Sequence, residues 1–592
     1  MRPKPEGKYR FILNLKELNK IVQYRHFKME SLKDVRDLVQ EGDYLIKIDL
    51  KDAFWSVPVN RKSRRLMRFE WEGILYEFRS LAFGLGPAPW VFTKLLKVPI
   101  SLLRKLGFFL IIYLDDMLIA AKSRREALQA RDSILFLLEN LGFTINREKS
   151  VLIPVHILDF LGMTVNSLEM TITLPEEKVL NITSLCQKTL NAEKVSLRDM
   201  SKVIGKLYAT SPAILQAPLQ LRYLQQDLIE AQREGRTYSD TLALSQNSRT
   251  ELRWWIFNLH LQKGKPLKLQ EPDMVIFSDA AQTKGWGAAM EGGPATGGPW
   301  SREEKETLHI NILELMAAEL AIKSFVNLRP VSSLHIWIDN QVALTYLVKM
   351  GGTKNQHLTK ISKRIWKFLL DRGIHLSAGW IPSKLNWRAD QESRRPPNSS
   401  DWLLHPPLFS VLTERWGRPT LDCFASRAMK QLQAYMSFQP DPESRGSNAL
   451  FHPWNEEFPY LFPPFCLLGR CLRKIQRERV PRAILIAPLW TGQPWFPPLL
   501  NSCIDCPLLL PLTSCLLTNL EGAPHPLVEN KTLKLGAFLV SGWPSKAREF
   551  QTGLPLCSWD LRENQQLTST VVHGRDGVLG ALNGKLIPLI AL

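Results

Sequence analysis

Phe108-Phe109-Leu110-Ile111-Ile112-Tyr113-Leu114-Asp115-Asp116-Met117-Leu118-Ile119-Ala120-Ala121 is the stretch that decides the fold, because two adjacent carboxylates interrupt an apolar run. Seven apolar or aromatic residues precede the pair and five follow it, which predicts two buried strands joined by a tight turn. Asp hydrogen-bonds its own backbone in turns, so a polar hairpin tip without chemistry is the simplest interpretation. Such a tip also holds both carboxylates together, where a divalent cation such as Mg²⁺ relieves their repulsion. A third carboxylate and a phosphate-facing surface elsewhere would favour the second interpretation.

Two further stretches supply these features. Residues 44–48 predict a short apolar strand that ends at Asp49, and residues 81–89 predict a Gly/Pro-rich loop that opens a helix. With the basic stretch at 8–19, the order is basic stretch, Asp strand, FGLxxAP loop and YLDD hairpin. This order resembles the reverse transcriptases of retroelements. One such motif is weak evidence and four in order are strong, so the resemblance implies a polymerase palm.

The resemblance implies a role for single residues of this polymerase. Asp49, Asp115 and Asp116 are the expected catalytic acids, which hold two Mg²⁺ ions, or Mn²⁺, to activate the primer 3′-hydroxyl and stabilise the leaving pyrophosphate. The backbone of Leu50 is expected to add an oxygen ligand. The expected nucleotide-binding residues are Lys8 and Arg10 on the triphosphate, Phe54 as the steric gate that favours dNTPs, Phe83 and Gly84 against the nascent base pair, and Lys149 as the proton donor to pyrophosphate.

Simpler alternatives stay open for several of these residues. Lys8 and Arg10 also fit an exposed basic strand, Phe54 fits a core aromatic, and Lys149 fits a solvated lysine. The fingers motif starts almost at residue 1, so the chain is expected to lack the earlier fingers segment.

A second group of acids lies in the middle of the chain. Residues 275–281, 312–319 and 334–340 predict a strand, a helix and a strand, and 381–390 follow with a further acid. The four acids are Asp279, Glu314, Asp339 and Asp390. Singly, each is more often a helix cap or a surface residue. Together their order resembles ribonuclease H, which implies two metal ions that activate a water for attack on an RNA phosphate.

One departure from that family concerns proton transfer. Trp380 stands where the family often has His, and Ser383 stands for a Gly. Indole cannot shuttle protons as imidazole does. The expectation is therefore metal binding with slow turnover.

The C-terminal third resembles a degenerate phage-type DNA adenine methyltransferase. Residues 419–426, 460–465 and 482–490 predict strands followed by loops, and the wording at 311–315 and 339–341 resembles DIRS-type retrotransposons, some of which carry such a domain. Phe462 replaces the Asn or Asp that accepts the adenine amino group in that family. A non-catalytic relic or binding domain is therefore favoured. S-adenosylmethionine is not expected, although Asp422 is placed to face it.

The expected fold class is multidomain α/β and α+β: a right-hand polymerase, a ribonuclease H-like α/β domain and a Rossmann-like methyltransferase-type α/β domain. The expected domains are truncated fingers and palm at 1–174, thumb at 175–224, tether at 225–272, ribonuclease H-like domain at 273–395, linker at 396–415, methyltransferase-like domain at 416–518, and an unclassified region at 519–592.

Composition agrees with an intracellular protein that binds nucleic acid. The 592 residues allow about four domains of roughly 150 residues, and 45% hydrophobic with 22% charged residues is globular composition. The net charge of +19 suits a polyanionic partner. Eight cysteines are too few for a disulfide scaffold, so we expect cytoplasm or nucleus and not secretion. The CxxC pair Cys503 and Cys506 fits core or loop, and no stretch predicts a membrane span.

The predicted function is RNA-directed DNA polymerase with ribonuclease H activity, from a retrotransposon. The expected partners are an RNA template, a DNA primer, an RNA–DNA hybrid and dNTPs. The alternative is a catalytically silent nucleic-acid-binding remnant of such an element. The sequence leaves the oligomeric state open.

Overall fold

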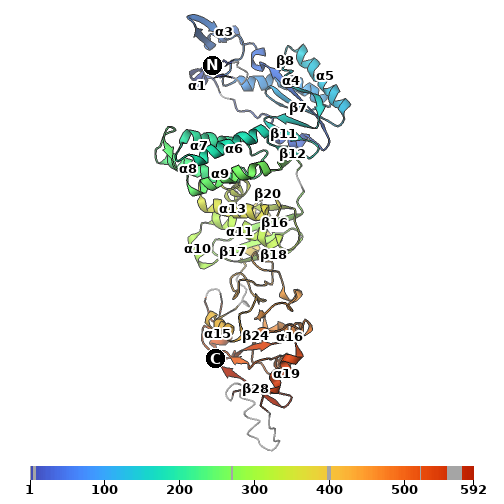
Figure 1. Ribbon diagram of the computed structural model, residues 1–592, viewed down its shortest axis with the longest axis vertical. Coiled ribbons are helices and arrows are strands. Elements are labelled where there is room, and N and C mark those ends of the chain that lie inside the picture. Colours follow the sequence, from blue (N-terminus) through green and yellow to red (C-terminus); the bar gives the residue numbers. More distant parts are fainter. Residues whose placement is uncertain are drawn as a thin grey trace, which may run out of the picture. The chain divides into compact units, whose positions relative to one another are not determined.

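The structure is a computed structural model, which describes residues 2–3, 9–11, 13–23, 25–268, 271–395, 402–519, 522–555 and 577–592. The chain divides into two compact units, Met1–Gln270 and Glu271–Leu592 (Figure 1). Both units combine sheets with helices, so the predicted multidomain α/β class is confirmed. Within the described residues, no helix has the length and apolar content needed to cross a bilayer.

The predicted hairpin forms the centre of an antiparallel sheet in the first unit. The sheet has the order β6 (Phe109–Tyr113), β7 (Asp116–Ala121), β3 (Tyr44–Lys51) and β8 (Thr144–Ile145), and β9 (Val151–Val155) also pairs with β3. Leu114 has a φ of 53°, the left-handed conformation that closes the tight turn. One face of β3 and β7 packs on helices. From Ile46 to Leu50, β3 alternates between buried and half-buried positions, whereas residues 117–121 of β7 are all buried, so both faces of β7 are covered.

Two amphipathic helices cover that face. They are α4 (Ala88–Lys105) and α5 (Arg124–Asn140). Phe92 and Ile134 lie in one core cluster with Ile46 and Ile48 of β3. Ser123 caps the N-terminus of α5, since its Oγ accepts a hydrogen bond from the N–H of Glu126.

The helical region of the first unit extends further along the chain than the predicted thumb. A small sheet of β10 (Ile157–Phe160), β11 (Met163–Asn166), β12 (Thr171–Thr173) and β15 (Lys265–Pro266) shares a core with α6 (Glu176–Asn191), α7 (Leu197–Tyr208), α8 (Arg222–Arg233) and α9 (Gln246–Asn258). The helices α8 and α9 occupy the stretch expected to be a tether. Leu252 and Trp255 of α9 are fully buried, so this stretch is part of the core and not a free linker.

The second unit begins with a five-stranded mixed sheet. Its order is β18 (Ala295–Pro299), β17 (Gly285–Met290), β16 (Met274–Ala280), β19 (Ser333–Ile338) and β20 (His375–Trp380). Strands β16, β19 and β20 are parallel, so their carboxyl ends share one edge. The helices are α10 (Arg302–Thr307), α11 (Ile310–Val326), α12 (Gln341–Val348), α13 (Gln356–Leu370) and α14 (Trp387–Ser393). Helix α11 is apolar on all sides and largely buried.

A six-stranded sheet organises the C-terminal part of the second unit. Its order is β22 (Leu421–Asp422), β23 (Pro459–Leu461), β24 (Ala483–Pro488), β27 (Leu535–Val540), β25 (Leu508–Leu509) and β30 (Ile590–Ala591). Strand β27 is antiparallel to β24 and lies in the middle of the sheet. A central strand of this domain therefore comes from the stretch 519–592, which the sequence left unclassified. Its helices include α15 (Pro406–Trp416), α16 (Leu468–Arg477) and α19 (Pro544–Thr552).

Candidate active sites

The first candidate site lies at one end of β3 and β7. Asp49 stands directly opposite Asp116 in the antiparallel register. Asp115 occupies the exposed turn before β7, and its carbonyl oxygen accepts a hydrogen bond of 2.9 Å from the N–H of Leu50. The fold therefore brings the three predicted acids to one end of the sheet, although they are not a group within 4.8 Å of one another.

Two side chains that the sequence did not indicate, Asn146 and Lys47, lie against these acids. Asn146 Nδ2 donates a hydrogen bond of 2.8 Å to Asp49 Oδ1. Burial raises the pKa of Asp49, the hydrogen bond from Asn146 lowers it, and repulsion from Asp116 raises it again. Lys47 Nζ lies 3.5 Å from Asp116 Oδ1, an oxygen that is buried and has no hydrogen-bond partner.

The predicted nucleotide-binding residues lie on several elements near these strands. Phe54, in the 3₁₀ helix η1 (Ala53–Ser56), is half-buried, with its ring 5.5 Å from that of Phe83. Gly84 has a φ of 101°, and its carbonyl accepts a hydrogen bond of 2.8 Å from Asn19 Nδ2. Lys149 is exposed and close enough to Asp49 to lower its pKa.

The remaining predicted residues of this site are Lys8, Arg10 and Leu50. Lys8 lies outside the described residues, and Arg10 lies in the two-residue strand β2 (Tyr9–Arg10). Leu50 is buried and pairs with Ile145 of β8.

The second candidate site gathers three carboxylates. Oxygens of Asp279 on β16, Glu314 on α11 and Asp339 after β19 all lie within 4.8 Å of one another. The parallel strands place the two aspartates at one edge, and α11 packs across β16, so the glutamate reaches the same point.

Without a bound cation, the ionised forms of these carboxyl groups are unfavourable. Burial, together with repulsion between the acids, raises the pKa of Asp279 to about 6 and that of Glu314 to about 9. Glu314 Oε2 is buried without a hydrogen-bond partner. Carboxylate oxygens are the ligands that Mg²⁺ prefers, so the residues present fit a divalent cation.

Hydroxyl groups hold two of these carboxylates. Ser393 Oγ donates to Asp279 Oδ2 at 2.6 Å, and Ser383 Oγ donates to Asp339 Oδ2 at 2.8 Å. The fourth predicted acid, Asp390 on α14, is not one of the three close carboxylates, and Arg394 Nε donates to its Oδ1 at 2.7 Å. Trp380 is 47% exposed, and its Nε1 donates to the carbonyl of Asp339 at 2.9 Å.

Asp422 in the C-terminal sheet is held by its own loop. It is buried at the end of β22, where burial raises its pKa to about 6, and its carboxylate accepts from the N–H groups of Gln431 and Phe424 at 3.0 and 3.4 Å. Phe462 is half-buried, 6.4 Å from the ring of Phe465. The CxxC residue Cys503 is a buried free thiol, as expected for core chemistry.

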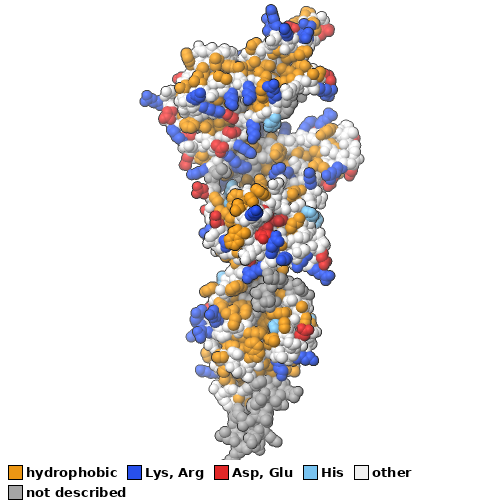
Figure 2. Space-filling model, turned by 180° about the vertical axis from the view of Figure 1, so that it is seen from behind, with side chains coloured by type: hydrophobic (Ala, Val, Ile, Leu, Met, Phe, Trp, Pro, Cys, Tyr) orange, Lys and Arg blue, Asp and Glu red, His pale blue; other side chains and the backbone are white. Residues whose placement is uncertain are grey.

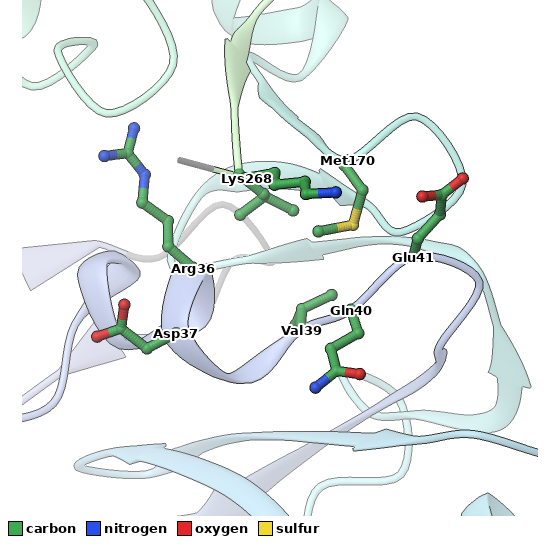
Figure 3. A pocket seen from close by; sticks show the side chains of 8 residues that line it. Arg36, Asp37, Val39, Gln40, Glu41, Met170 and Lys268 are labelled. Atoms are coloured by element: carbon green, nitrogen blue, oxygen red, sulfur yellow. The ribbon is translucent and has the colours of Figure 1, made fainter. Parts of the chain in front are cut away.

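A cavity of about 490 Å³ opens in the first unit. Side chains of both charges line it, including Arg36, Lys268 and Glu41, and Met170 closes one side (Figure 3). None of the candidate catalytic acids is among its lining residues.

Comparison with known proteins finds a family model that matches the segment holding the first site. Residues 2–165 match the family model described as "Reverse transcriptase (RNA-dependent DNA polymerase)". The predicted relation to reverse transcriptases is therefore confirmed for this part of the chain.

Relatives with curated descriptions are viral polyproteins. The Pro-Pol polyprotein of Simian foamy virus type 3 (strain LK3) is 29% identical over 182 residues, which cover 31% of this chain and 16% of the relative. The Enzymatic polyprotein of Cauliflower mosaic virus (strain Strasbourg) is 25% identical over 290 residues, which cover 49% of this chain and 40% of the relative. The chain thus spans less than half the length of these relatives.

Solved structures of a foamy viral protease-reverse transcriptase are also similar in part. One, in complex with double-stranded DNA, has a TM-score of 0.41 and 17% identity over 64% of this chain and 64% of that chain. Another, in complex with an RNA/DNA hybrid, has a TM-score of 0.40 and 17% identity over 64% of this chain and 49% of that chain.

Proposed function

We propose that the chain is an RNA-directed DNA polymerase that extends a DNA primer on an RNA template. The observation that carries this proposal is the pairing of Asp49 with Asp116 beside the Asp115 turn, inside the segment that matches the reverse transcriptase family. The adjacent aromatic residue Phe54 offers a bulky ring for sugar selection.

Each residue of the polymerase site has a separate proposed role. Asp49, Asp115 and Asp116 would hold divalent cations, which lower the pKa of the primer hydroxyl and neutralise the leaving pyrophosphate. Asn146 lowers the pKa of Asp49 by donating to its carboxylate, and the exposed ammonium of Lys149, which also lowers the pKa of Asp49, would donate a proton to the departing pyrophosphate.

The second site supports ribonuclease H activity on RNA–DNA hybrids in the same chain. Oxygens of three carboxylates, on a strand, on a helix and after a parallel strand, lie within 4.8 Å of one another and could hold a divalent cation. Asp390, which accepts a hydrogen bond from Arg394, would be the fourth acid of a site for two cations. The short sequence motifs at 311–315 and 339–341 favour a DIRS-type retrotransposon as the source, with a non-catalytic methyltransferase-like domain at the C-terminus.

The polymerase proposal is tested by primer extension on an RNA template with Mg²⁺. Asp115→Asn should abolish extension and leave template–primer binding nearly unchanged, because affinity comes mainly from Lys and Arg contacts to phosphates. Asp132→Asn, an exposed acid on α5, is the matched control and should extend normally.

Two outcomes would count against this proposal. Equal loss of binding in Asp115→Asn would make the aspartate a structural turn residue. Absence of extension by the unaltered chain, and also by a chain supplied with an upstream fingers segment, would favour the silent nucleic-acid-binding remnant.

The ribonuclease proposal has its own test. Glu314→Gln should abolish cleavage of the RNA strand in an RNA–DNA hybrid, whereas Glu303→Gln, an exposed acid on α10, should not. If both variants cut like the unaltered chain, the nuclease is not this site.

A further inference from the structure

The helix α16 carries a row of arginines on its solvent face. Its other face buries Leu468, Leu472 and Ile475 in the C-terminal core. The exposed residues Arg470, Arg473 and Arg477 are spaced by three and four positions, so they lie on one side of the helix. Figure 2 shows Lys and Arg side chains gathered at the edge of this domain where α16 lies.

Helix stability explains Arg477, in the last turn of α16, but not the rest of this row. Cations stabilise a helix at its C-terminus and destabilise it at its N-terminus, yet Arg470 lies in the first turn of α16. Within the described residues, no ion pair joins Arg470 or Arg473 to a carboxylate. The neighbouring acid Glu478 is already engaged, because Lys474 and the N–H of Trp454 both donate to it.

The N-terminus of α19 is fixed next to the end of this row. Gly542 donates to the carbonyl of Val480 at 2.8 Å, and Ser541 Oγ donates to the carbonyl of Pro481 at 2.9 Å. A Cβ on Gly542 would lie 2.0 Å from the carbonyl oxygen of Ile475, so only glycine permits this close approach to α16.

An exposed aromatic ring stands at this junction. Trp543 is 41% exposed, and the guanidinium of Arg479 lies 6.0 Å from its ring centroid. Lys546, in the first turn of α19, donates to the carbonyl of Pro481 at 3.2 Å. The segment that follows the arginine row therefore carries an exposed indole with Arg479 against its ring, and Lys546 lies three residues further along the chain.

We propose that this basic–aromatic surface, made of Arg470, Arg473, Arg477, Arg479, Trp543 and Lys546, binds single-stranded nucleic acid. Fixed cations track a phosphate backbone, and an exposed ring stacks on an unpaired base. A duplex offers phosphates but no free base face, so the indole favours a single strand. The proposal goes beyond the polymerase and ribonuclease sites, and its test uses no catalysis.

The experiment uses the full chain in EDTA. Labelled single-stranded oligo-dT is titrated by fluorescence anisotropy at several salt concentrations, with an excess of unlabelled primer–template duplex to occupy duplex-binding sites. Arg470→Ala/Arg473→Ala is compared with Arg418→Ala/Lys534→Ala, which removes two exposed cations elsewhere in the same domain.

The expected results separate the two chemical contributions. Loss of two phosphate contacts should reduce the slope of log K against log salt by about 1.4, at about 0.7 per contact, and the control pair should leave it unchanged. Trp543→Ala should weaken binding by about fivefold or more, and Trp543→Phe should retain most of the affinity, because phenylalanine still stacks. Asp132→Asn and Glu303→Gln, which change exposed acids outside this surface, should bind oligo-dT like the unaltered chain.

Crosslinking identifies where the strand lies on the full chain. Oligonucleotides with 4-thiothymidine should crosslink to peptides that contain residues 470–479 or Trp543. Crosslinks confined to other peptides, or equal effects of the two double variants, would overturn the proposal. Dependence on the arginines without any effect of Trp543→Ala would show a general polyanion surface and would overturn the assignment to single strands.

Discussion

Asn146 determines how easily Asp49 keeps its negative charge. Because its hydrogen bond lowers the pKa of Asp49, Asn146→Ala should raise that pKa. Polymerase activity needs the ionised carboxylate, so the acidic limb of the pH–rate profile should move to higher pH. The measurement is the primer extension rate from acid to neutral pH.

Asn140→Ala, at the exposed end of α5, is the control for this prediction. It should leave the acidic limb in place. An unshifted limb in Asn146→Ala would mean that Asp49 is not the group whose ionisation limits the rate.

Trp380 occupies a position beside Asp339 where imidazole would transfer protons. A general acid–base group typically contributes about 10²–10⁴-fold, so Trp380→His should accelerate multiple-turnover cleavage of RNA–DNA hybrids by at least about tenfold. Trp387→His, an exposed tryptophan in the same domain, should have no such effect. Equal rates for Trp380→His and the unaltered chain would show that the site works without an imidazole.

The raised pKa values of Asp279 and Glu314 link metal binding to stability. Their pKa values rise from 3.8 to about 6 and from 4.5 to about 9, so the folded state keeps protons that the unfolded state releases. Without metal, the stabilising contribution of these two carboxyls is therefore fully present below their unfolded-state pKa values of 3.8 and 4.5, and it is lost as pH rises through about 6 and about 9. A bound cation replaces those protons.

Mg²⁺ should accordingly raise the Tm of this unit more at alkaline than at acid pH, as measured by differential scanning calorimetry. Glu314→Gln should raise the metal-free Tm at alkaline pH and remove most of the Mg²⁺ increment. If Mg²⁺ raised the Tm by the same amount at every pH, this would contradict the coupling between these carboxyls and the metal.

For single residues, the sequence predicted the acids of both sites but not the side chains that donate hydrogen bonds to them. These acids lie close to the ends of strands or helices, so local patterns predict their positions: Asp49 and Asp279 near the ends of β3 and β16, Asp116 at the start of β7, and Glu314 in the second turn of α11. Their hydrogen-bond donors could not be identified, because the contact of Asn146 with Asp49 joins residues 97 positions apart. A long-range contact of this kind depends on how β3 and the segment after α5 pack, which no local pattern encodes.

Helix α9 lies beyond the predicted end of the thumb, in the stretch expected to be a tether, and its buried side chains make it part of the same core. Trp255 is fully buried, and its Nε1 donates to the carbonyl of Gln220 at 2.7 Å. Trp255→Ala should lower the free energy of unfolding by about 3–5 kcal/mol. Phe257→Ala on the exposed side of α9 should change it by no more than about 0.5 kcal/mol. Urea unfolding measures both, and equal small effects would restore the tether interpretation.

Local and non-local elements differ in how well the sequence predicted them. The β6–β7 hairpin was predicted in full, because its strands adjoin and its turn is two residues long. The strand β27 lies in the region that the sequence left unclassified, since its six residues become a strand by pairing with β24 far back in the chain. Short apolar runs of this length carry no decisive period of their own.

The whole C-terminal domain depends on β27, which joins β24 to β25. A chain that ends at Asn519 lacks this strand, so residues 402–519 should become sensitive to limited trypsin digestion while 271–395 stay resistant. A chain that ends at Pro555 keeps β27 and α19 and should resist like the full chain. Mass spectrometry of the fragments distinguishes them, and equal resistance of both shortened chains would show that β27 is dispensable.

The central position of β27 also has a consequence during synthesis on the ribosome. Strand β24 ends at Pro488 and its partner begins at Leu535, 47 residues later. At about 5–20 residues per second, β24 emerges roughly 2–10 s before β27 can cover it. All six residues of β24 are buried in the finished domain, so the nascent chain holds an apolar, unpaired edge during that interval. Chaperones that shield such edges should therefore bind the nascent chain at this stage.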